Sequence, residues 1–140
     1  MSQPRQASRT AQPAGVTARP AAVTAAAAVV ACSALWTALL AIGHLGVEVP
    51  LVSALGPGGS RVVLTAGIVF AVATTIFAAI AIGLARAQPW AWTAGVLVNG
   101  LALLSGALEF RGAGSVVGML LAAAALVLLL TPRARRALSR

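Results

Sequence analysis

The sequence predicts an all-α fold, a four-helix antiparallel transmembrane bundle with both termini on the cytoplasmic side. Three observations lead to this prediction: the composition, the spacing of the charged residues, and the side of the membrane on which the arginines fall. Of the 140 residues, 60% are hydrophobic and 9% are charged, whereas soluble domains are about 25% charged. The composition therefore excludes an ordinary soluble domain, and the single cysteine excludes a disulfide framework.

Charged residues divide the chain into four apolar segments. Intervals of 21 to 24 residues without Asp, Glu, Lys, Arg or His lie between Arg19 and His44, Arg61 and Arg86, Arg86 and Glu109, and Arg111 and Arg133. A helix of about 20 apolar residues crosses the hydrocarbon core and satisfies its own backbone groups there. The expected helices are 21–43, 62–85, 90–109 and 114–131, which together make a transmembrane domain over 21–131.

The arginines predict the orientation of these spans. Four spans place both tails and the middle loop on one side, which then carries eight of the ten arginines. The other side carries two arginines and both glutamates. Because basic residues are enriched on the cytoplasmic side, we expect the termini inside, at the inner (cytoplasmic) membrane of the cell. Residues 1–20 are predicted to be a disordered cytoplasmic tail, and residues 132–140 a basic cytoplasmic tail.

Small residues recur at intervals of four in two of the expected helices, the spacing that lets membrane helices approach closely. The second expected helix carries Gly67, Ala71, Thr75, Ala79 and Gly83, and the fourth carries Gly114, Gly118 and Ala122. We expect these residues to form helix-packing contacts inside the bundle. Faces for a homodimer are the alternative.

Polar side chains within the spans are few. Asn99, near the middle of the third expected helix, is the most polar, and we expect it to hydrogen-bond to another helix. A polar contact in a substrate or lipid cavity is its alternative role. His44, Glu48 and Glu109 are candidates at the external face, and His44 would align with Glu48 if the first helix continued for another turn. A metal site usually needs three protein ligands, so ordinary interfacial polarity is the expected role of these residues.

The first span and the loop after it leave alternatives open. Val29-Val30-Ala31-Cys32 is similar to a bacterial lipobox, in which the cysteine is lipidated, but the apolar run continues to Gly43 and favours a packing role for Cys32. A cleaved signal peptide is a second alternative, although its apolar core is usually about 7–15 residues long. Residues 44–60 contain helix-breaking Pro and Gly, and the apolar stretch within them can lie along the membrane interface or dip into it.

The second half of the chain carries a recognisable arrangement. Pro89 suits the first turn of the third helix, and Trp90 and Trp92 follow at headgroup depth. The strings ARAQPWAWTAGVLVNGLALLSG and GMLLAAAALVLLLTPRARRAL, over about 84–138, resemble a group of uncharacterised small four-helix integral membrane proteins of high-GC actinobacteria. That resemblance implies a location in the cytoplasmic membrane and no particular activity.

These observations narrow the function classes. The +8 charge is spread over tails and loops without a nucleic-acid-binding motif or interleaved aromatics, which argues against nucleic-acid binding. Charge-free spans argue against a proton relay and against the coupling carboxylate of small multidrug exporters. We expect no catalytic residue, cofactor or metal, and instead a non-enzymatic structural or accessory protein that packs with lipid, itself or a larger membrane complex. A small oligomeric transporter or holin-like pore is the alternative, and Asn99, Thr75 and Ser105 are its only polar contributors.

Overall fold

The computed structural model describes residues 21–55, 62–110 and 112–138, and this part of the chain is built of helices and turns without a strand. The predicted tail 1–20 lies outside the described residues. The helices are α1 (Ala21–His44), α2 (Pro50–Leu55), α3 (Leu64–Ala85), α4 (Pro89–Leu108), α5 (Ala113–Leu129) and α6 (Pro132–Leu138). The all-helical fold class is therefore confirmed, and the long helices lie within two residues of their expected bounds.

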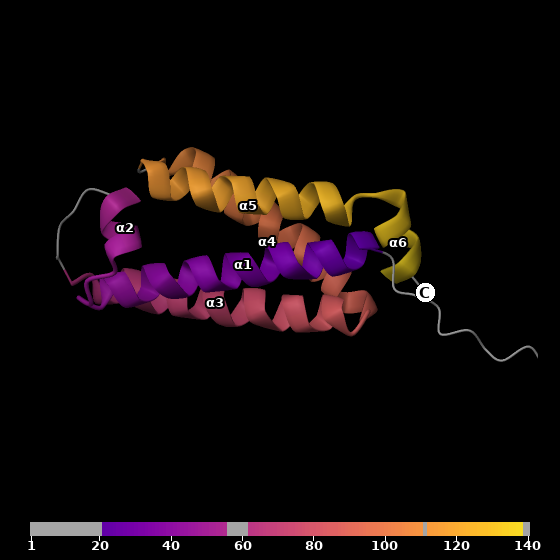
Figure 1. Ribbon diagram of the computed structural model, residues 1–140, viewed down its shortest axis with the longest axis horizontal. Helices are drawn as coiled ribbons and strands as arrows, with labels where there is room; N and C mark the ends of the chain where they lie inside the picture. The colour runs from indigo at the N-terminus through magenta and orange to yellow at the C-terminus, as the bar shows by residue number, and fades with distance from the viewer. Residues whose placement is uncertain (1–20, 56–61, 111, 139–140) are drawn as a thin grey trace, which may run out of the picture.

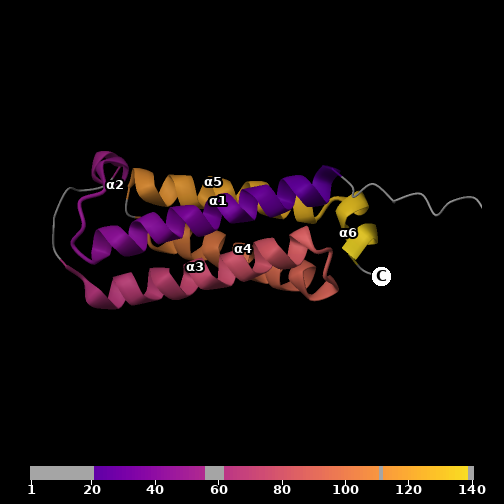
Figure 2. The ribbon, with the colours of Figure 1, turned by 60° about the horizontal axis from the view of Figure 1, so that its bottom comes forward.

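The four long helices lie side by side along the length of the molecule (Figures 1 and 2). Helix α1 packs along α3, α4 packs along α5, and α1 also contacts α5. The short helices sit at opposite ends, α2 beside the start of α5 and α6 beside the start of α1 (Figure 1). Of the described helices, α1, α3 and α4 are long and apolar enough to span a membrane, and α5 reaches that length only together with α6, at a bend of 72°.

The most completely buried apolar side chains gather at the α6 end of the molecule. They come from α1 up to Ala34, the second halves of α3 and α5, the start of α4, and α6: Val23, Ala26, Val30, Ala34, Phe77, Ile80, Ala81, Leu84, Ala91, Ala125, Leu129, Ala134 and Leu138. Six of these thirteen are alanine, which lets the helix backbones approach closely at this end.

The C-terminal segment expected as a basic tail instead contains helix α6. Pro132 has no N–H to continue the hydrogen bonding of α5, and the Thr131 hydroxyl takes its place by donating to the Leu128 carbonyl at 2.8 Å. The same hydroxyl accepts the Ala134 N–H at 3.3 Å, which makes Thr131 the N-cap of α6. Ala134 and Leu138, four residues apart, are then buried against the bundle. Local capping and one short apolar face thus convert a basic segment into a docked helix.

The small-residue stripe of α3 does not form a continuous contact inside the bundle. Gly67 is buried against Leu45, and Gly83 is buried against α4, but Ala71, Thr75 and Ala79 between them are exposed. Each step of four residues turns about 40° beyond a full helical turn, so the four steps from Gly67 to Gly83 sweep about 160° around the helix. The two ends therefore meet different neighbours, and the middle of the stripe faces outward.

The small residues of α5 have an aromatic partner. A Cβ on Gly114 would lie 3.8 Å from Cζ2 of Trp36, and one on Gly118 would lie 3.8 Å from its Nε1. Trp36 is itself buried, as is Ala122 one turn further along α5. In the structure the small residues Gly114 and Gly118 of α5 pack against the Trp36 indole of α1.

Gly83 provides a direct stability prediction. A Cβ at this position would lie 2.7 Å from the Ala91 Cβ, so Gly83→Leu must displace α4 and should cost about 1–3 kcal/mol of unfolding free energy. Ala79→Leu is the matched control, because Ala79 is one turn away and exposed. Thermal unfolding in detergent should show a lower Tm for Gly83→Leu alone. Equal Tm values for the two variants would mean that α3 and α4 do not meet at Gly83.

Candidate functional site

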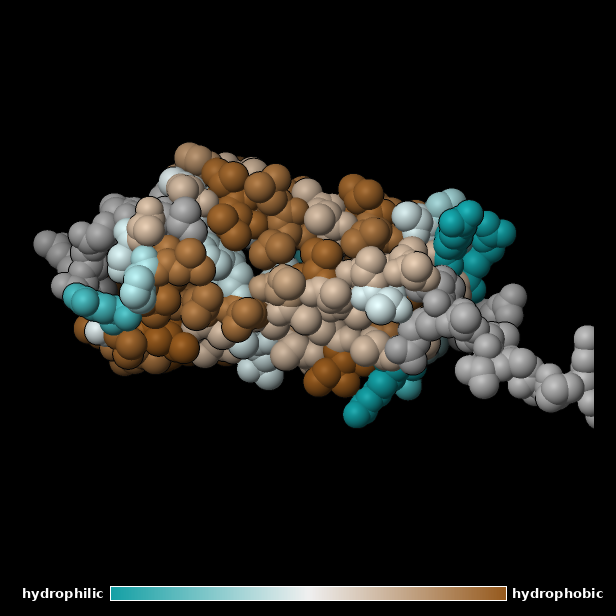
Figure 3. Space-filling model, viewed as in Figure 1, coloured by the Kyte–Doolittle hydropathy of each residue, from teal (hydrophilic) through white to brown (hydrophobic). Residues whose placement is uncertain are grey.

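Charged side chains are confined to the two ends of the described structure. Arg86 and the arginines of α6 lie at one end, and Glu48 and Glu109 lie at the other. Figure 3 shows this on one face, where brown and tan residues cover the length of the molecule and teal residues appear at its ends. The segregation along the chain that the sequence indicates therefore becomes a segregation in space.

An apolar surface joins these ends. Large apolar side chains are exposed along the long helices, among them Val69, Val72, Ile76, Leu97, Leu101, Leu104, Leu120 and Val127. Soluble monomers rarely expose continuous apolar patches beyond a few hundred Å². Three to four apolar helices with such an exterior are compatible with integration into a membrane.

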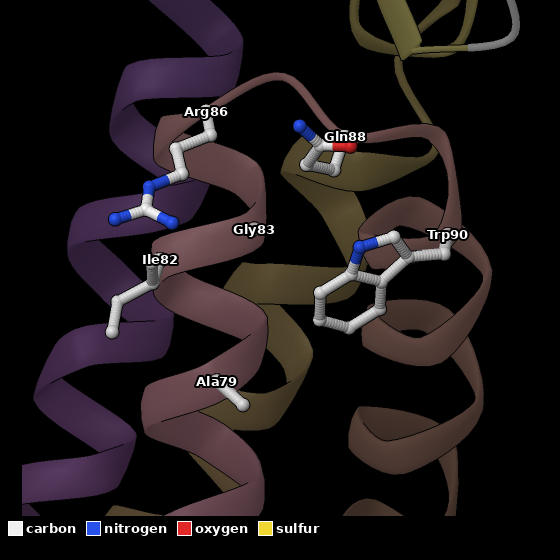
Figure 4. Close-up of a pocket in the computed structure, with 6 residues that line it drawn as sticks. All are labelled: Ala79, Ile82, Gly83, Arg86, Gln88 and Trp90. Atoms are coloured by element: carbon white, nitrogen blue, oxygen red, sulfur yellow. The ribbon is translucent and has the colours of Figure 1, made fainter.

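A groove opens between α3 and α4 at the arginine end (Figure 4). It measures about 390 Å³ and is lined by Ala79, Ile82, Gly83, Arg86, Gln88 and Trp90. In Figure 4 the Trp90 indole leans toward Gly83, and the Arg86 side chain runs back along α3 toward Ile82. A Cβ on Gly83 would lie 2.8 Å from Trp90 Cζ2. The glycine therefore lets the indole lie directly against the α3 backbone.

The turn between α3 and α4 positions the polar residues of this groove. The Ala87 N–H donates to the Leu84 carbonyl at 3.0 Å, and the Gln88 N–H donates to the Gly83 carbonyl at 2.9 Å, the pair of bonds that ends a helix in a Schellman motif. Ala87 takes the left-handed conformation at φ 53°, which costs a residue with a Cβ about 1–2 kcal/mol. Pro89 then opens α4. The chain reverses within three residues and brings Arg86 and Trp90 to one groove.

A second aromatic residue, Trp92, forms a hydrogen bond with the end of α5. The Trp92 indole N–H donates to the Leu129 carbonyl at 2.9 Å, one of the carbonyls that the end of α5 leaves without a helical partner. The Arg135 guanidinium carbon lies 6.0 Å from the centre of the Trp92 ring, at the outer limit of a cation–π contact. Trp92 thus joins α4, the end of α5 and α6.

Asn99 is fully buried, and its hydrogen bonding differs from the expected interhelical bond. Its amide nitrogen donates to the Gly95 carbonyl of its own helix at 2.8 Å. Its carbonyl oxygen Oδ1 has no hydrogen-bond partner within the described part of the chain. Besides the Trp92 bond, a hydrogen bond between two helices comes from Thr74, whose hydroxyl donates to that of Thr37 at 3.0 Å. Nothing in the spacing of these two threonines distinguishes them from the other threonines of the spans.

The three polar residues considered for a pore do not share a face. Thr75 and Ser105 are exposed, and their hydroxyls donate to carbonyls of their own helices, at Ala71 and Leu101. Asn99 is buried inside the bundle. Within one chain these residues therefore do not line a common path.

The candidates at the other end also remain apart. His44 Nδ1 lies 2.8 Å from the Leu40 carbonyl, and its ring centroid lies 5.1 Å from that of Phe70. Helix α1 ends at His44 and the chain turns at Gly46, with φ 90°, so the extra turn that would align His44 with Glu48 does not form. Glu109 follows α4 as its C-cap. Among the described residues, no group of three His, Cys, Asp or Glu side chains is placed to hold a metal ion.

The chain matches no protein-family model, no curated protein and no solved structure. Geometry and charge are therefore the basis for assigning a role to the chain.

The groove at the α3–α4 turn was not predicted as a site, and the one sequence signal for it is the closeness of Arg86 and Trp90 to Pro89.

Asn99 supplies a prediction with a definite sign. Leaving a buried acceptor unpaired costs about 1–3 kcal/mol, so Asn99→Leu, a change of similar size, should preserve or raise the free energy of unfolding in detergent. Asn99→Ala is the control that also removes the acceptor but leaves a cavity, and it should be less stable than Asn99→Leu. Destabilisation by Asn99→Leu beyond about 1 kcal/mol would reveal a partner for Oδ1 in the assembled protein.

Proposed function

We propose that this chain is a four-span integral membrane protein of the cytoplasmic membrane that serves as a non-enzymatic structural or accessory subunit. Both termini, the α3–α4 turn and α6 lie on the cytoplasmic side, and α2 and the α4–α5 turn lie outside. In this arrangement the four long helices form an antiparallel transmembrane bundle. Its partners are the surrounding lipid and a membrane protein, either another copy of the chain or a larger complex, and nucleic acid is not among them.

The observation that carries this proposal is the uncharged apolar exterior between two charged ends. Charged side chains are costly in the hydrocarbon core, and the four long helices carry no Asp, Glu, Lys or Arg. The positive-inside bias favours the arginine end as the cytoplasmic one. The resemblance of residues 84–138 to small actinobacterial membrane proteins points to the same location.

Helix α5 is the fourth span in this proposal, although it is the shortest. Its 17 residues make a helix about 26 Å long, against a hydrocarbon core of about 30 Å. A deficit of this size is met by local thinning of the bilayer or by flanking residues that reach the interface. The bend at Pro132 supports this interpretation, because it turns the arginines of α6 sideways at the membrane surface.

A structural role is supported by where the polar groups direct their hydrogen bonds. Ser33, Thr75 and Ser105 all donate to carbonyls of their own helices. Such bonds satisfy the hydroxyls without preparing them for a substrate. The outward-facing small residues Ala71, Thr75 and Ala79 leave a part of α3 where another helix can approach closely.

Cysteine labelling tests the topology of the proposal. In a Cys32→Ser background, Ser53→Cys reports on α2 and Arg136→Cys on α6, and both native side chains are exposed. A membrane-impermeant maleimide should label Ser53→Cys in intact cells and Arg136→Cys only after permeabilisation. The reverse pattern, or equal labelling of both variants before permeabilisation, would contradict the proposed orientation.

Flux measurements separate the proposed role from the pore alternative. Purified full-length protein in sealed vesicles should not raise the leakage of small ions or dyes above that of vesicles without protein. Leakage that increases with protein concentration would instead support an oligomeric transporter or holin-like pore.

A further inference from the structure

The arginines at the α6 end have no acidic side chain to neutralise them. The whole chain contains two acidic residues, Glu48 and Glu109, and both belong to the opposite end of the structure. Arg86, Arg133, Arg135 and Arg136 are all exposed at this end. No ion pair joins Arg86 to another described side chain. The negative charge that balances these residues must therefore come largely from outside the protein.

Arg86 differs from the arginines of α6 in its surroundings. Those of α6 are carried on a helix that lies across the end of the bundle (Figure 1). Arg86 instead lines the upper part of the α3–α4 groove, where its side chain runs along α3, while Gln88 lies on the turn and Trp90 on the α4 wall (Figure 4). Below it the groove continues along apolar Ile82 and Ala79. The lining of one groove thus combines a cation, an amide, an indole and apolar side chains.

We propose that this groove binds an anionic phospholipid, with its phosphate at Arg86 and Gln88 and an acyl chain along Ile82 and Ala79. The proposal rests on the proposed function, because it requires the α3–α4 turn to lie at the depth of the lipid headgroups. A guanidinium is well suited to a phosphate, since it donates several N–H groups in one plane. An interfacial indole suits the boundary between headgroup and acyl chain.

The apolar part of the groove favours a lipid over a soluble anion. Inorganic phosphate would use the arginine and the amide but would gain nothing from Ile82, Ala79 or the Trp90 ring. A phospholipid uses both halves, and the groove opens onto the apolar exterior along which acyl chains would lie. Filling the groove should therefore weaken binding even when every charge is kept.

Native mass spectrometry of the full-length protein tests the proposal through lipid retention. The protein is released from mixed micelles that contain equal amounts of phosphatidylglycerol and phosphatidylcholine, and the ratio of retained lipids is measured. The protein should retain phosphatidylglycerol preferentially. Arg86→Gln should lower that preference about fivefold, because it removes a hydrogen-bonded partner of the lipid phosphate in the groove. Ala79→Leu, which leaves all charges in place, should also reduce phosphatidylglycerol retention.

Arg133→Gln is the matched control, because it removes an equivalent exposed charge from α6, outside the groove. Its preference for phosphatidylglycerol should change less than twofold. An equal loss in Arg86→Gln and Arg133→Gln would overturn the proposal in favour of diffuse attraction to anionic lipid. Displacement of phosphatidylglycerol by millimolar inorganic phosphate would overturn it in favour of a soluble-anion site.

Flotation with vesicles and extraction at alkaline pH separate this proposal from the proposed function. A protein that is extracted from the membrane contradicts the membrane assignment itself. A protein that stays integrated but shows no preference for phosphatidylglycerol contradicts the lipid site alone. Circular dichroism of the variants verifies that each retains its helices.

Discussion

In the proposed membrane-embedded state, the exclusion of charge from the bilayer interior is the constraint on which the rest of this structure depends. It confines the described charges to the two ends of the molecule. It also requires the terminal N–H and C=O groups of each helix to find hydrogen-bond partners at those ends. The α5–α6 junction shows the consequence most clearly. Pro132 interrupts the helical hydrogen bonding of the backbone. There the Thr131 hydroxyl donates a hydrogen bond to the Leu128 carbonyl, and the Trp92 indole N–H donates one to the Leu129 carbonyl. Side chains at the bundle end thereby complete a helix that its own backbone cannot.

Hydropathy and charge spacing predict the long helices because one strong free-energy term, the transfer of apolar side chains out of water, decides where they form. A span of about 20 apolar residues has few alternatives in a bilayer. The short helices α2 and α6 depend on weaker local terms, and neither was predicted. In α6 a threonine cap and the burial of Ala134 and Leu138 outweigh the polar character of a segment rich in arginine. Such effects act between neighbours in space and have no clear period in the sequence.

The small residues of α3 show the same contrast between what sequence spacing predicts and what depends on neighbours in space. Spacing identifies Gly67 and Gly83 as positions of close approach, but it does not reveal that they meet different helices. The rotation of a four-residue stripe around a straight helix accounts for the exposure of Ala71, Thr75 and Ala79. The groove beside Gly83 was beyond prediction for a related reason. It requires the reversal at Ala87 to bring Arg86 and Trp90 together, and an alanine is an unexpected residue for a left-handed turn.

The depth of the exposed apolar residues in a bilayer is the most direct test of the account. Spin labels in a Cys32→Ser background can be placed at the exposed residues Leu64, Ile76 and Ala85 along α3 and at Leu120 in the middle of α5. In a membrane-embedded bundle, accessibility to oxygen, relative to a water-soluble nickel chelate, should be greatest at Ile76 and Leu120 and should fall toward both ends of α3. A nickel chelate that reaches Ile76 or Leu120 as readily as Leu64 would contradict a membrane-embedded bundle.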